Sequence, residues 1–435
     1  MAVAPPSPSY GGQAIYQQRH PQSTPLYFLV DSLYEKVKAV WEERFERSHG
    51  FWRGFLDDIV ARFLDCGVLE SGFARVFCDH CKDEYLLPYS CKCRGFCPSC
   101  NAKRAAAFVA FLKDELLQDV CHAQWVFTIP KMLRPYFLYH RELLGKLCQA
   151  AYETVKELMV AAVQDKDIRP GMVAVIQTFS DNLLFNPHVH ALATRGGWNA
   201  QGQWIPVPYI DPHAAELLFR QKIFRLLKNQ GLLSDERIEL LLSWRHTGFS
   251  VDNSVTVYPS DEQGLERLAR YMIRSPVSLQ RLHYIPETQQ VLYQSNKGQD
   301  HEDSEILDSM EFLARVLMHV PDLNKSYIRY YGIYSNRSNL KPRKDSTPAE
   351  ATQNEDPPGV SNSNLRRRWA NLIRRVYLAD PLICPKCASK MRILSFITQS
   401  KVINKILEHL KNRATPTRAP PTPRRLQQAP LPLSP

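Results

Sequence analysis

The pattern of apolar and polar positions predicts alternating helices and strands, grouped around one hairpin. Apolar residues at helical spacing predict helices over 27–66, 101–118, 139–163, 217–242 (broken near Gly231) and 307–320. Alternating runs predict strands over 123–129, 172–179, 185–194, 204–207 and 248–258. Because only a short Ser180-Asp181-Asn182 turn follows 172–179, we expect 172–179 and 185–194 to form an antiparallel pair.

The strand at 185–194 carries the first candidate chemistry. Positions 189, 191 and 193 are apolar and share one face, whereas His188 and His190 lie on the other face. Two imidazoles on one face, two positions apart, can share a divalent metal ion. Gln177, on the neighbouring strand, is the candidate third ligand. The alternative is a pair of histidines satisfied within a core or at a surface, because a lone His-x-His motif is common.

A helix near residue 270 is the second informative segment. The capping-box pattern Ser260-Asp261-Glu262-Gln263 predicts its start, and a proline ends it. Its leucines group on one side, and Tyr271 lies on the other with Arg267, Arg270 and Arg274. Neighbouring cations stabilise a phenolate and can hold a phosphate. Metal, tyrosine and arginine together suit phosphodiester transfer through a covalent phosphotyrosine. A solvent-facing tyrosine on a basic surface is the alternative.

The cysteines occur in pairs with the spacing of structural zinc ligands. Cys78 and Cys81 form one C-x-x-C pair and, after fifteen intervening residues, Cys97 and Cys100 form another. Two such pairs predict four thiolate ligands around one Zn²⁺ ion. The choice of ligands stays open at this point, because other candidates lie within or beside this segment: Cys91, Cys93 and His80.

Basic residues accompany these cysteines. Arg94, Lys103 and Arg104 are candidate DNA contacts, because a basic and aromatic module can hold a nucleic-acid backbone and stack on bases. The alternative is a zinc ion that only stabilises a small subdomain. A further C-x-x-C pair, Cys384 and Cys387, has no second pair close by in sequence, so its role stays open.

Composition narrows the class of protein. The 55 Lys and Arg residues exceed the 44 Asp and Glu residues, giving a net charge of +11 that favours a polyanionic partner, although a merely basic protein also fits. We expect no membrane partner, because no apolar run is long enough to span a bilayer and the N-terminus lacks a secretory signal. Eleven clustered cysteines suit metal binding in a reducing cytosol, so we expect a cytoplasmic protein.

Shifts in composition predict the organisation of the chain. The expected parts are a disordered N-terminus at 1–25, a helical and zinc-binding domain at 26–118, a catalytic domain at 119–340, a linker at 341–363, a basic helical segment with the second cysteine pair at 364–412, and a disordered tail at 413–435.

These motifs, in this order, resemble the rolling-circle insertion-sequence transposases of the HUH endonuclease class that carry an N-terminal transposase zinc-binding domain. The matching stretches are Phe63-Leu-Asp-Cys66-Gly, Ser90-Cys-Lys-Cys-Arg-Gly-Phe-Cys-Pro-Ser-Cys100, Gln177-Thr-Phe, Asn186-Pro-His-Val-His190, Leu268-Ala-Arg-Tyr271-Met-Ile-Arg274-Ser-Pro276, Arg329-Tyr-Tyr-Gly-Ile-Tyr-Ser-Asn336 and Asp380-Pro-Leu-Ile-Cys-Pro-Lys-Cys387.

The resemblance implies an α+β fold, in which an antiparallel sheet with helices packed on it follows a small zinc-binding domain. It implies nicking and joining of single-stranded DNA, at the ends of a mobile element, with Mg²⁺ or Mn²⁺. His188 and His190 match the family's metal ligands, and Tyr271 matches its nucleophile. Some members have a second tyrosine four residues earlier, where this chain has Arg267, so the chain resembles the single-tyrosine branch.

Two other functions stay open. A plasmid replication initiator or relaxase would use the same chemistry on a different DNA. A non-catalytic zinc-ribbon DNA-binding protein would use the histidines and Tyr271 only structurally. The sequence leaves the oligomeric state open, and with one tyrosine the second strand transfer needs a freed 3′-hydroxyl or a second protomer.

Overall fold

The structure is a computed structural model that describes residues 9–10, 13–14, 20–207, 209–294, 304–335 and 382–413. Several predictions fall on the other residues and lie outside the described part: most of the 1–25 terminus, the 341–363 linker, the first part of the basic segment (364–381), and nearly all of the tail. Residues 20–25 are described and contradict the predicted disorder. They form a 3-10 turn, η1 (Pro21–Ser23), and the first residue of α1, which Thr24 caps by accepting from the backbone of Tyr27.

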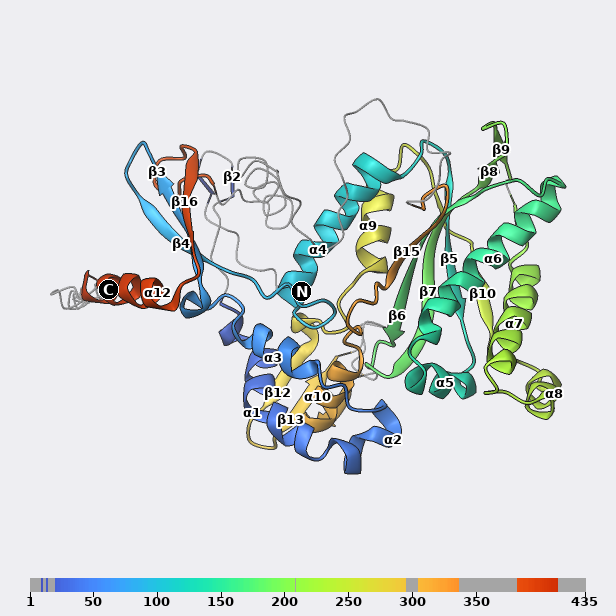
Figure 1. The fold of residues 1–435 in the computed structure, drawn as a ribbon, viewed down its shortest axis with the longest axis horizontal. Helices are drawn as coiled ribbons and strands as arrows, with labels where there is room; N and C mark the ends of the chain where they lie inside the picture. Colours follow the sequence, from blue (N-terminus) through green and yellow to red (C-terminus); the bar gives the residue numbers. More distant parts are fainter. Residues whose placement is uncertain are drawn as a thin grey trace, which may run out of the picture.

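The centre of the molecule is a six-stranded antiparallel sheet. Its order is β10-β5-β7-β6-β15, and β11 also pairs with β5. The strands are β5 (His122–Thr128), β6 (Gly171–Phe179), β7 (Phe185–Thr194), β10 (Ser250–Asp252), β11 (Thr256–Val257) and β15 (Ile328–Gly332). The predicted antiparallel pair is confirmed as β6 and β7, and the α+β prediction with helices on an antiparallel sheet is also confirmed (Figure 1).

Helices cover both faces of this sheet (Figure 1). Val189 and Ala191 of β7 are buried in a core with the helices of one face, α5 (Arg134–Tyr139), α6 (Leu143–Val163), α7 (Pro212–Asn229) and α8 (Asp235–Ser243). Leu192 of β7 packs on the other face with α4 (Pro98–Phe111) and α9 (Glu262–Met272). Because side chains alternate along a strand, the odd-numbered positions enter the first core and the two histidines face α9.

The predicted boundary near residue 118 does not separate two cores. The N-terminal helices α1 (Pro25–Ala39), α2 (Glu46–His49) and α3 (Leu56–Leu64) and a π-helical turn, η2 (Trp41–Phe45), share a core with a later segment. That segment contains an antiparallel sheet of β12 (Leu282–Ile285), β13 (Gln290–Tyr293) and β14 (Glu305–Asp308), followed by α10 (Ser309–Met318). The N-terminal helices and the 282–318 segment therefore share one hydrophobic core.

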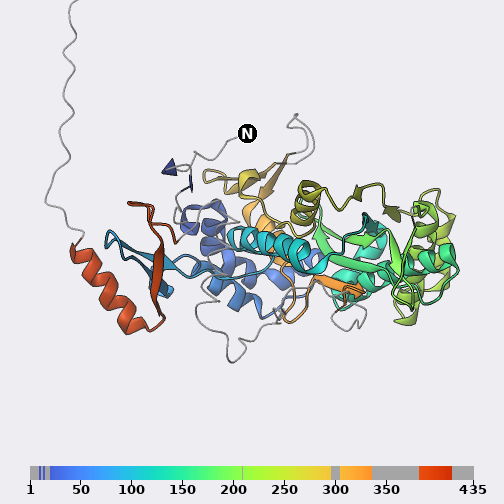
Figure 2. The ribbon, with the colours of Figure 1, turned by 90° about the horizontal axis from the view of Figure 1, so that it is seen from above.

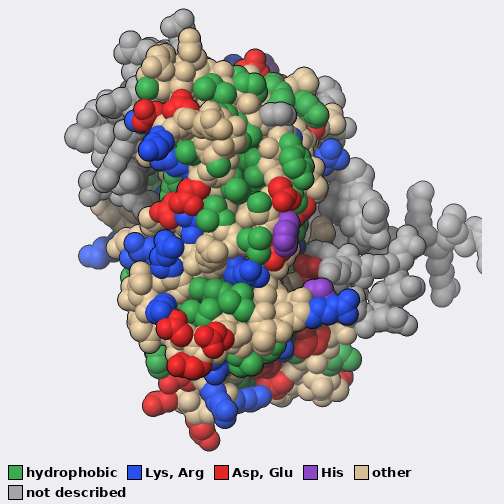
Figure 3. All heavy atoms as spheres, turned by 90° about the vertical axis from the view of Figure 1, so that its right-hand side faces the viewer, with side chains coloured by type: hydrophobic (Ala, Val, Ile, Leu, Met, Phe, Trp, Pro, Cys, Tyr) green, Lys and Arg blue, Asp and Glu red, His purple; other side chains and the backbone are tan. Residues whose placement is uncertain are grey.

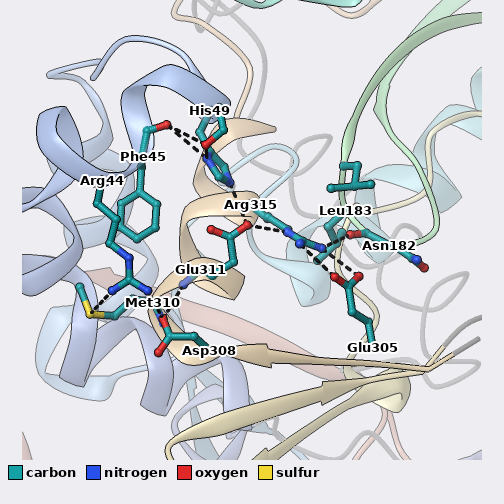
Figure 4. A network of polar contacts seen from close by, with 12 residues as sticks. Arg44, Phe45, His49, Asn182, Leu183, Glu305, Asp308, Met310, Glu311 and Arg315 are labelled. Carbon is teal, nitrogen blue, oxygen red and sulfur yellow. Dashed lines mark hydrogen bonds and ion pairs between the residues drawn. The ribbon is translucent and has the colours of Figure 1, made fainter. Parts of the chain in front are cut away.

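A buried arginine links the core that the N-terminal helices share with α10 to the β6–β7 turn of the central sheet (Figure 4). Arg315 of α10 donates hydrogen bonds of 2.9 and 3.0 Å to Glu305 and of 2.9 Å to Glu311. It also donates to the carbonyl of Asn182, in the turn between β6 and β7, at 3.0 Å. His49 of α2 lies 3.3 Å from Glu311. One network thus joins the N-terminal helices, α10 and the β6–β7 turn.

A third, smaller sheet unites distant parts of the sequence. Its order is β16-β3-β4, with β3 (Phe73–Cys78), β4 (Glu84–Pro88) and β16 (Met391–Ile397) antiparallel. Figures 1 and 2 both show β16 beside β3, at the opposite end of the molecule from α7 and α8. The helix α12 (Ser400–Arg413) follows and contacts the 3-10 turn η3 (Leu69–Ser71). The described part of the predicted separate C-terminal segment therefore completes the N-terminal zinc-binding region.

Short elements complete the described chain. They are β1 (Ser9–Tyr10), β2 (Gln13–Ala14), the π-helical turn η4 (Leu112–Leu116), the 3-10 turns η5 (Lys131–Leu133) and η6 (Leu279–Arg281), and the hairpin of β8 (Gly196–Trp198) and β9 (Trp204–Pro206). Within the described ranges, no helix combines the length and the apolar character needed to cross a membrane. On the face shown in Figure 3, acidic, basic and apolar side chains are interspersed, so the net positive charge is not gathered there.

Candidate active site

Two histidine side chains converge on the α9 side of the central sheet. His188 and His190 are both buried, and their Nε2 atoms lie 3.1 Å apart. The Nδ1 atom of His188 lies 2.7 Å from the carbonyl oxygen of Asn186, so this nitrogen is the donor and Nε2 carries the lone pair. Two ring nitrogens directed at one point fit a shared cation, because an imidazole ligand binds through its lone pair.

The surroundings hold both rings neutral. Burial lowers the pKa of His190 to about 3, with further lowering from His188 and Arg274. Burial is also the main cause of the lowered pKa of His188, and the positive charges of Arg274 and Arg134 act in the same direction. A neutral imidazole is the form that binds metal ions. Within the described residues, no cysteine, histidine or carboxylate completes a three-residue cluster with these two histidines.

Tyr271 stands beside the histidine pair on the last turn of α9. Asp261, rather than the predicted Ser260, caps this helix by accepting from the backbone of Gly264. Leu268, Ala269 and Met272 are buried as predicted, whereas the Tyr271 side chain is 44% exposed. The Tyr271 ring meets the His190 ring edge to face, with centroids 5.2 Å apart. The predicted metal ligands and the predicted nucleophile are therefore in contact, and a substrate can reach the tyrosine from solvent.

The three arginines of this helix region differ in position. Arg274 lies over the Tyr271 ring, 4.8 Å from its centroid, and donates to Asp181 at 3.3 Å. Arg270 instead pairs with Glu266 one turn earlier, at 2.7 Å. Arg267 is exposed. Arg274 is thus the predicted arginine that the structure brings to the tyrosine and the histidines.

Gln177 lies on the strand next to the histidines, as the sequence predicted, but its hydrogen bonds were not predicted. It lies directly opposite His188 in the β6–β7 register. Its Nε2 donates to the carbonyl oxygens of Tyr271 and Met272, both at 2.9 Å, and its Oε1 accepts from Arg274 at 3.4 Å. The amide is therefore engaged at both ends. These contacts favour a positioning role for Gln177 over the predicted role of metal ligand.

A cleft that adjoins the end of α9 has several basic residues in its lining. Four cationic side chains line it: Arg94, Arg104, Arg274 and Lys325. Burial, and then the neighbouring charge of Arg94, lower the pKa of Arg104, which indicates that two like charges face one another. Such a pair is stabilised by an anion between them. Lys103, the other predicted contact on α4, is half-buried, and burial lowers its pKa.

A second cavity, of about 690 Å³, lies on the other side of Arg274. Its lining includes Cys97 and Ser99 at the start of α4, and Ser275 and Arg281 after α9. Both cavities are bordered by Asn101, Phe179, Arg274 and Pro276. The two cavities therefore extend from the end of α9 to the start of α4 in the cysteine-rich region.

The predicted grouping of the cysteines is wrong, because the structure forms two clusters. Cluster 1 contains Cys66, Cys91, Cys97 and Cys100, and cluster 2 contains Cys78, Cys81, Cys384 and Cys387. Within each cluster the sulfur atoms all lie within 4.8 Å of one another. The physical reason is the β3–β4 hairpin. A strand of six residues spans roughly 20 Å, so cluster 1 forms at the base of the hairpin and cluster 2 at its tip.

Sequence reasoning missed Cys66 as a ligand position in cluster 1 and left Cys91 as an open candidate. Cys66 lies 4.0 Å from Cys97 and 3.9 Å from Cys100, and Cys91 lies 3.5 Å from Cys100, sulfur to sulfur. Cys93, the other candidate, instead directs its thiol to the carbonyl of Ile59, at 3.5 Å. The Cys66-Gly turn immediately after α3 could have indicated this ligand, but Cys66 belongs to no C-x-x-C pair.

Comparison with known proteins gives matches over both regions. A family described as "Transposase zinc-binding domain" matches residues 37–129, and one described as "Putative transposase" matches residues 171–341. The first range includes all of cluster 1, and the second includes His188, His190 and Tyr271.

Two curated relatives are similar over most of their length. The transposase for insertion sequence element IS801 of Pseudomonas savastanoi pv. phaseolicola is 26% identical over 368 residues, covering 79% of this chain and 85% of that protein. "Putative transposase y4qJ" of Sinorhizobium fredii (strain NBRC 101917 / NGR234) is 26% identical over 279 residues, covering 60% and 69%. No solved structure gives a significant match. The chain is thus similar to insertion-sequence transposases over most of its length, and its 37–129 region is similar to a transposase zinc-binding domain.

Proposed function

We propose that this protein is a DNA transposase that nicks and rejoins single-stranded DNA through a phosphotyrosine at Tyr271. The observation that carries the proposal is the contact of Tyr271 with His190, beside two imidazole nitrogens that converge at 3.1 Å. The matches to transposases, one of them of an insertion sequence element, support a role in DNA transposition, and rolling-circle-like transfer of an insertion sequence is part of the proposal. The HUH class of fold and the single-tyrosine branch belong to the same proposal.

The proposed reaction is a transesterification at phosphorus. The Tyr271 oxygen attacks a DNA phosphodiester and forms a P–O bond, and the bond to the 3′-oxygen breaks. The phenolic proton is lost to solvent, and the released 3′-oxygen takes up a proton. The 5′-phosphate is then held as a tyrosine ester, so a 3′-hydroxyl can reverse the step and join strands without a nucleotide cofactor. Tyr271 alone serves one transfer at a time, and Arg267 occupies the position of the second tyrosine in other members.

Neighbouring groups have separate roles in this step. Arg274 holds the Tyr271 ring and is directed by Asp181, so its guanidinium stabilises the phenolate and contacts the attacked phosphate. Gln177 holds the backbone of Tyr271 itself. His188 and His190 would hold a divalent cation, Mg²⁺ or Mn²⁺, which would supply Lewis-acid chemistry for phosphodiester transfer. Arg94, Arg104 and Lys325 bind the flanking backbone of the strand.

Other tyrosines are poorer candidates for the nucleophile. The Tyr334 hydroxyl is buried and lies 2.6 Å from His122 Nε2. The Tyr331 ring stacks on Tyr152 with centroids 4.9 Å apart. Burial raises the pKa of Tyr330 to about 12. Each of these phenols is less accessible than the exposed Tyr271.

Incubation with labelled single-stranded oligonucleotides and Mn²⁺ tests the proposal. The wild type should give a denaturant-resistant protein–DNA adduct that is lost in chelator and in Tyr271→Phe. The matched control is Tyr258→Phe, an exposed tyrosine outside the site, which should retain the adduct. An adduct that survives in Tyr271→Phe would overturn the assignment of the nucleophile. Tight binding without any adduct, on element-end sequences, would favour the non-catalytic zinc-ribbon alternative.

A joining assay separates the transposase from a replication initiator or relaxase. The purified adduct should transfer its strand to a second DNA that carries a free 3′-hydroxyl, and it should prefer oligonucleotides from the ends of the element. Joining only at a plasmid origin sequence would favour the initiator.

A further inference from the structure

Cluster 2 has the geometry of two repeated metal-binding turns, and the first begins at Cys78. The backbone N–H of Lys82 donates to the carbonyl of Cys78 at 3.0 Å, and the N–H of Cys78 donates to the carbonyl of Asp83 at 2.8 Å. Lys82 has a left-handed φ of 62°. The turn reverses the chain at the end of β3, and the two sulfurs of the Cys78-x-x-Cys81 pair lie within 4.8 Å of one another.

The second turn repeats the first. The N–H of Ala388 donates to the carbonyl of Cys384 at 3.0 Å, and the N–H of Cys384 donates to the carbonyl of Ser389 at 2.9 Å. Ala388 has a left-handed φ of 57°. The two segments share little sequence beyond C-x-x-C, so their common backbone shape reflects a common task. A left-handed residue directly after a C-x-x-C pair is costly for alanine or lysine, and a strong local constraint must compensate for it.

The two turns face one another with their sulfurs interleaved. The Cys78 and Cys387 sulfurs lie 3.5 Å apart, and the Cys81 and Cys384 sulfurs lie 3.4 Å apart. A tetrahedron of thiolates with metal–sulfur bonds of about 2.3 Å has edges of about 3.8 Å. A disulfide would require roughly 2.05 Å. The spacing in cluster 2 therefore approaches that of four ligands around one ion.

Two ion pairs join the segments of the chain that carry cluster 2. Lys386 of the second turn pairs with Asp83 of the first at 2.7 Å, and Arg392 of β16 pairs with Asp79 at 2.8 Å. Each of these cations is paired with a carboxylate, so the two ion pairs together add no net charge beside the cluster. The ion pairs also fix the register of the two turns, which lie more than 300 positions apart in sequence.

We propose that Cys78, Cys81, Cys384 and Cys387 bind a second structural Zn²⁺ ion, which anchors the C-terminal segment from residue 382 to the tip of the β3–β4 hairpin. Two of these ligands lie outside the matched zinc-binding region, which ends at residue 129. The apolar core beneath the site is small, with Val76, Leu87 and Ile393 among its few members. A core of this size needs a cross-link to be stable, and the ion supplies it.

Zinc content tests the proposal on the full chain. The protein, purified under reducing conditions and desalted, should lose one equivalent of zinc in Cys81→Ser relative to wild type, and the same amount in Cys384→Ser/Cys387→Ser. Cys81 is exposed, so its replacement by serine should leave the fold intact by circular dichroism. The matched control is Cys121→Ser, because Cys121 belongs to neither cluster. Equal zinc content in wild type and Cys81→Ser would overturn the proposal.

Two further measurements separate the outcomes. Limited proteolysis should release the 382–413 segment faster in Cys81→Ser than in wild type, at a zinc concentration that keeps cluster 1 loaded. Thiol titration of unfolded wild type should recover all eleven cysteines in the reduced form. Recovery of only seven, with Cys78–Cys387 and Cys81–Cys384 disulfides by mass spectrometry, would replace the zinc ion with a redox cross-link and refute the metal site.

Discussion

The side-chain amide of Asn101 donates a 2.9 Å hydrogen bond to the main-chain carbonyl of Ile273, 172 positions later in the sequence. Asn101 directly follows Cys100 of cluster 1, and Ile273 ends the helix that carries Tyr271. The last carbonyls of a helix lack intrahelical donors. Here two side-chain amides supply donors, Asn101 from α4 and Gln177 from β6. The cysteine cluster and the central sheet therefore both position the proposed nucleophile.

Asn101→Ala tests this link. The variant leaves a buried carbonyl unpaired and loosens the last turn of α9, at a cost of about 1–2 kcal/mol. We expect the rate of adduct formation to fall about tenfold, with DNA affinity nearly unchanged, because the cationic side chains of the cleft remain. Burst kinetics with labelled oligonucleotides and a parallel binding titration measure the two effects.

The control for this variant is Asn229→Ala, an exposed asparagine at the end of α7. It should change neither quantity. A loss of DNA affinity in Asn101→Ala that accounts for the whole change in rate would place Asn101 in DNA binding instead.

Gln177 offers a test between two roles. If it positions α9, Gln177→Glu should be inactive, because a carboxylate cannot donate to the carbonyls of Tyr271 and Met272 and is repelled by them. If Gln177 binds the cation, Gln177→Glu should still form the adduct and should reach half-maximal adduct yield at a lower Mn²⁺ concentration than wild type. We expect at least a tenfold loss of adduct formation that added Mn²⁺ does not rescue. A Mn²⁺ titration of adduct yield decides between the two.

The central hairpin and the faces of its strands could be predicted from the sequence, because their pattern is local. Alternation along 185–194 placed the histidines on one face, and the helical spacing around Tyr271 placed it away from the leucines. The convergence of the two segments follows from α9 packing on the sheet face that carries Leu192. No local sequence pattern encodes the packing of α9 on this face, so the convergence could be recognised only from the structure.

The cysteine pairing could not be predicted, because it depends on long-range topology. Four ligands can be drawn from the clustered cysteines in several ways, and the spacing of two C-x-x-C pairs favours the wrong one. The β3–β4 hairpin separates its base from its tip, and β16 returns Cys384 and Cys387 to that tip. The shared core of the N-terminal helices with α10 was missed for the same reason.

Arg274 should be the most sensitive arginine of the α9 region. The Cζ atom of its guanidinium lies 4.8 Å from the Tyr271 ring centroid and 5.2 Å from the Phe179 ring centroid, and the group donates to Asp181. Arg274→Lys keeps the charge but loses the planar contacts, so we expect a fall in adduct formation of about tenfold, with a larger fall for Arg274→Ala. Arg267→Ala is the matched control, because Arg267 is exposed on the same helix, and its effect should disappear at higher salt. Equal losses in the two alanine variants would contradict a specific role for Arg274.

Glu311 should make the stability of the fold depend on pH in the acidic range. Hydrogen bonds from His49 and then Arg315 hold the pKa of Glu311 at about 2, below its ordinary value of 4.5, although burial opposes them. A carboxylate with a depressed pKa stabilises the folded state above the unfolded pKa, and this contribution is lost as the pH falls from about 4.5 to about 2. Glu311→Gln should therefore lower the free energy of unfolding by about 2 kcal/mol at pH 7 and flatten its pH dependence below pH 5.

Urea unfolding of wild type and the Glu311→Gln variant between pH 3 and pH 7 measures this pH dependence. Glu43→Gln, at an exposed glutamate of η2, should follow the wild-type curve. A Glu311→Gln curve parallel to wild type at every pH would show that the network in Figure 4 does not depend on the charge of this carboxylate.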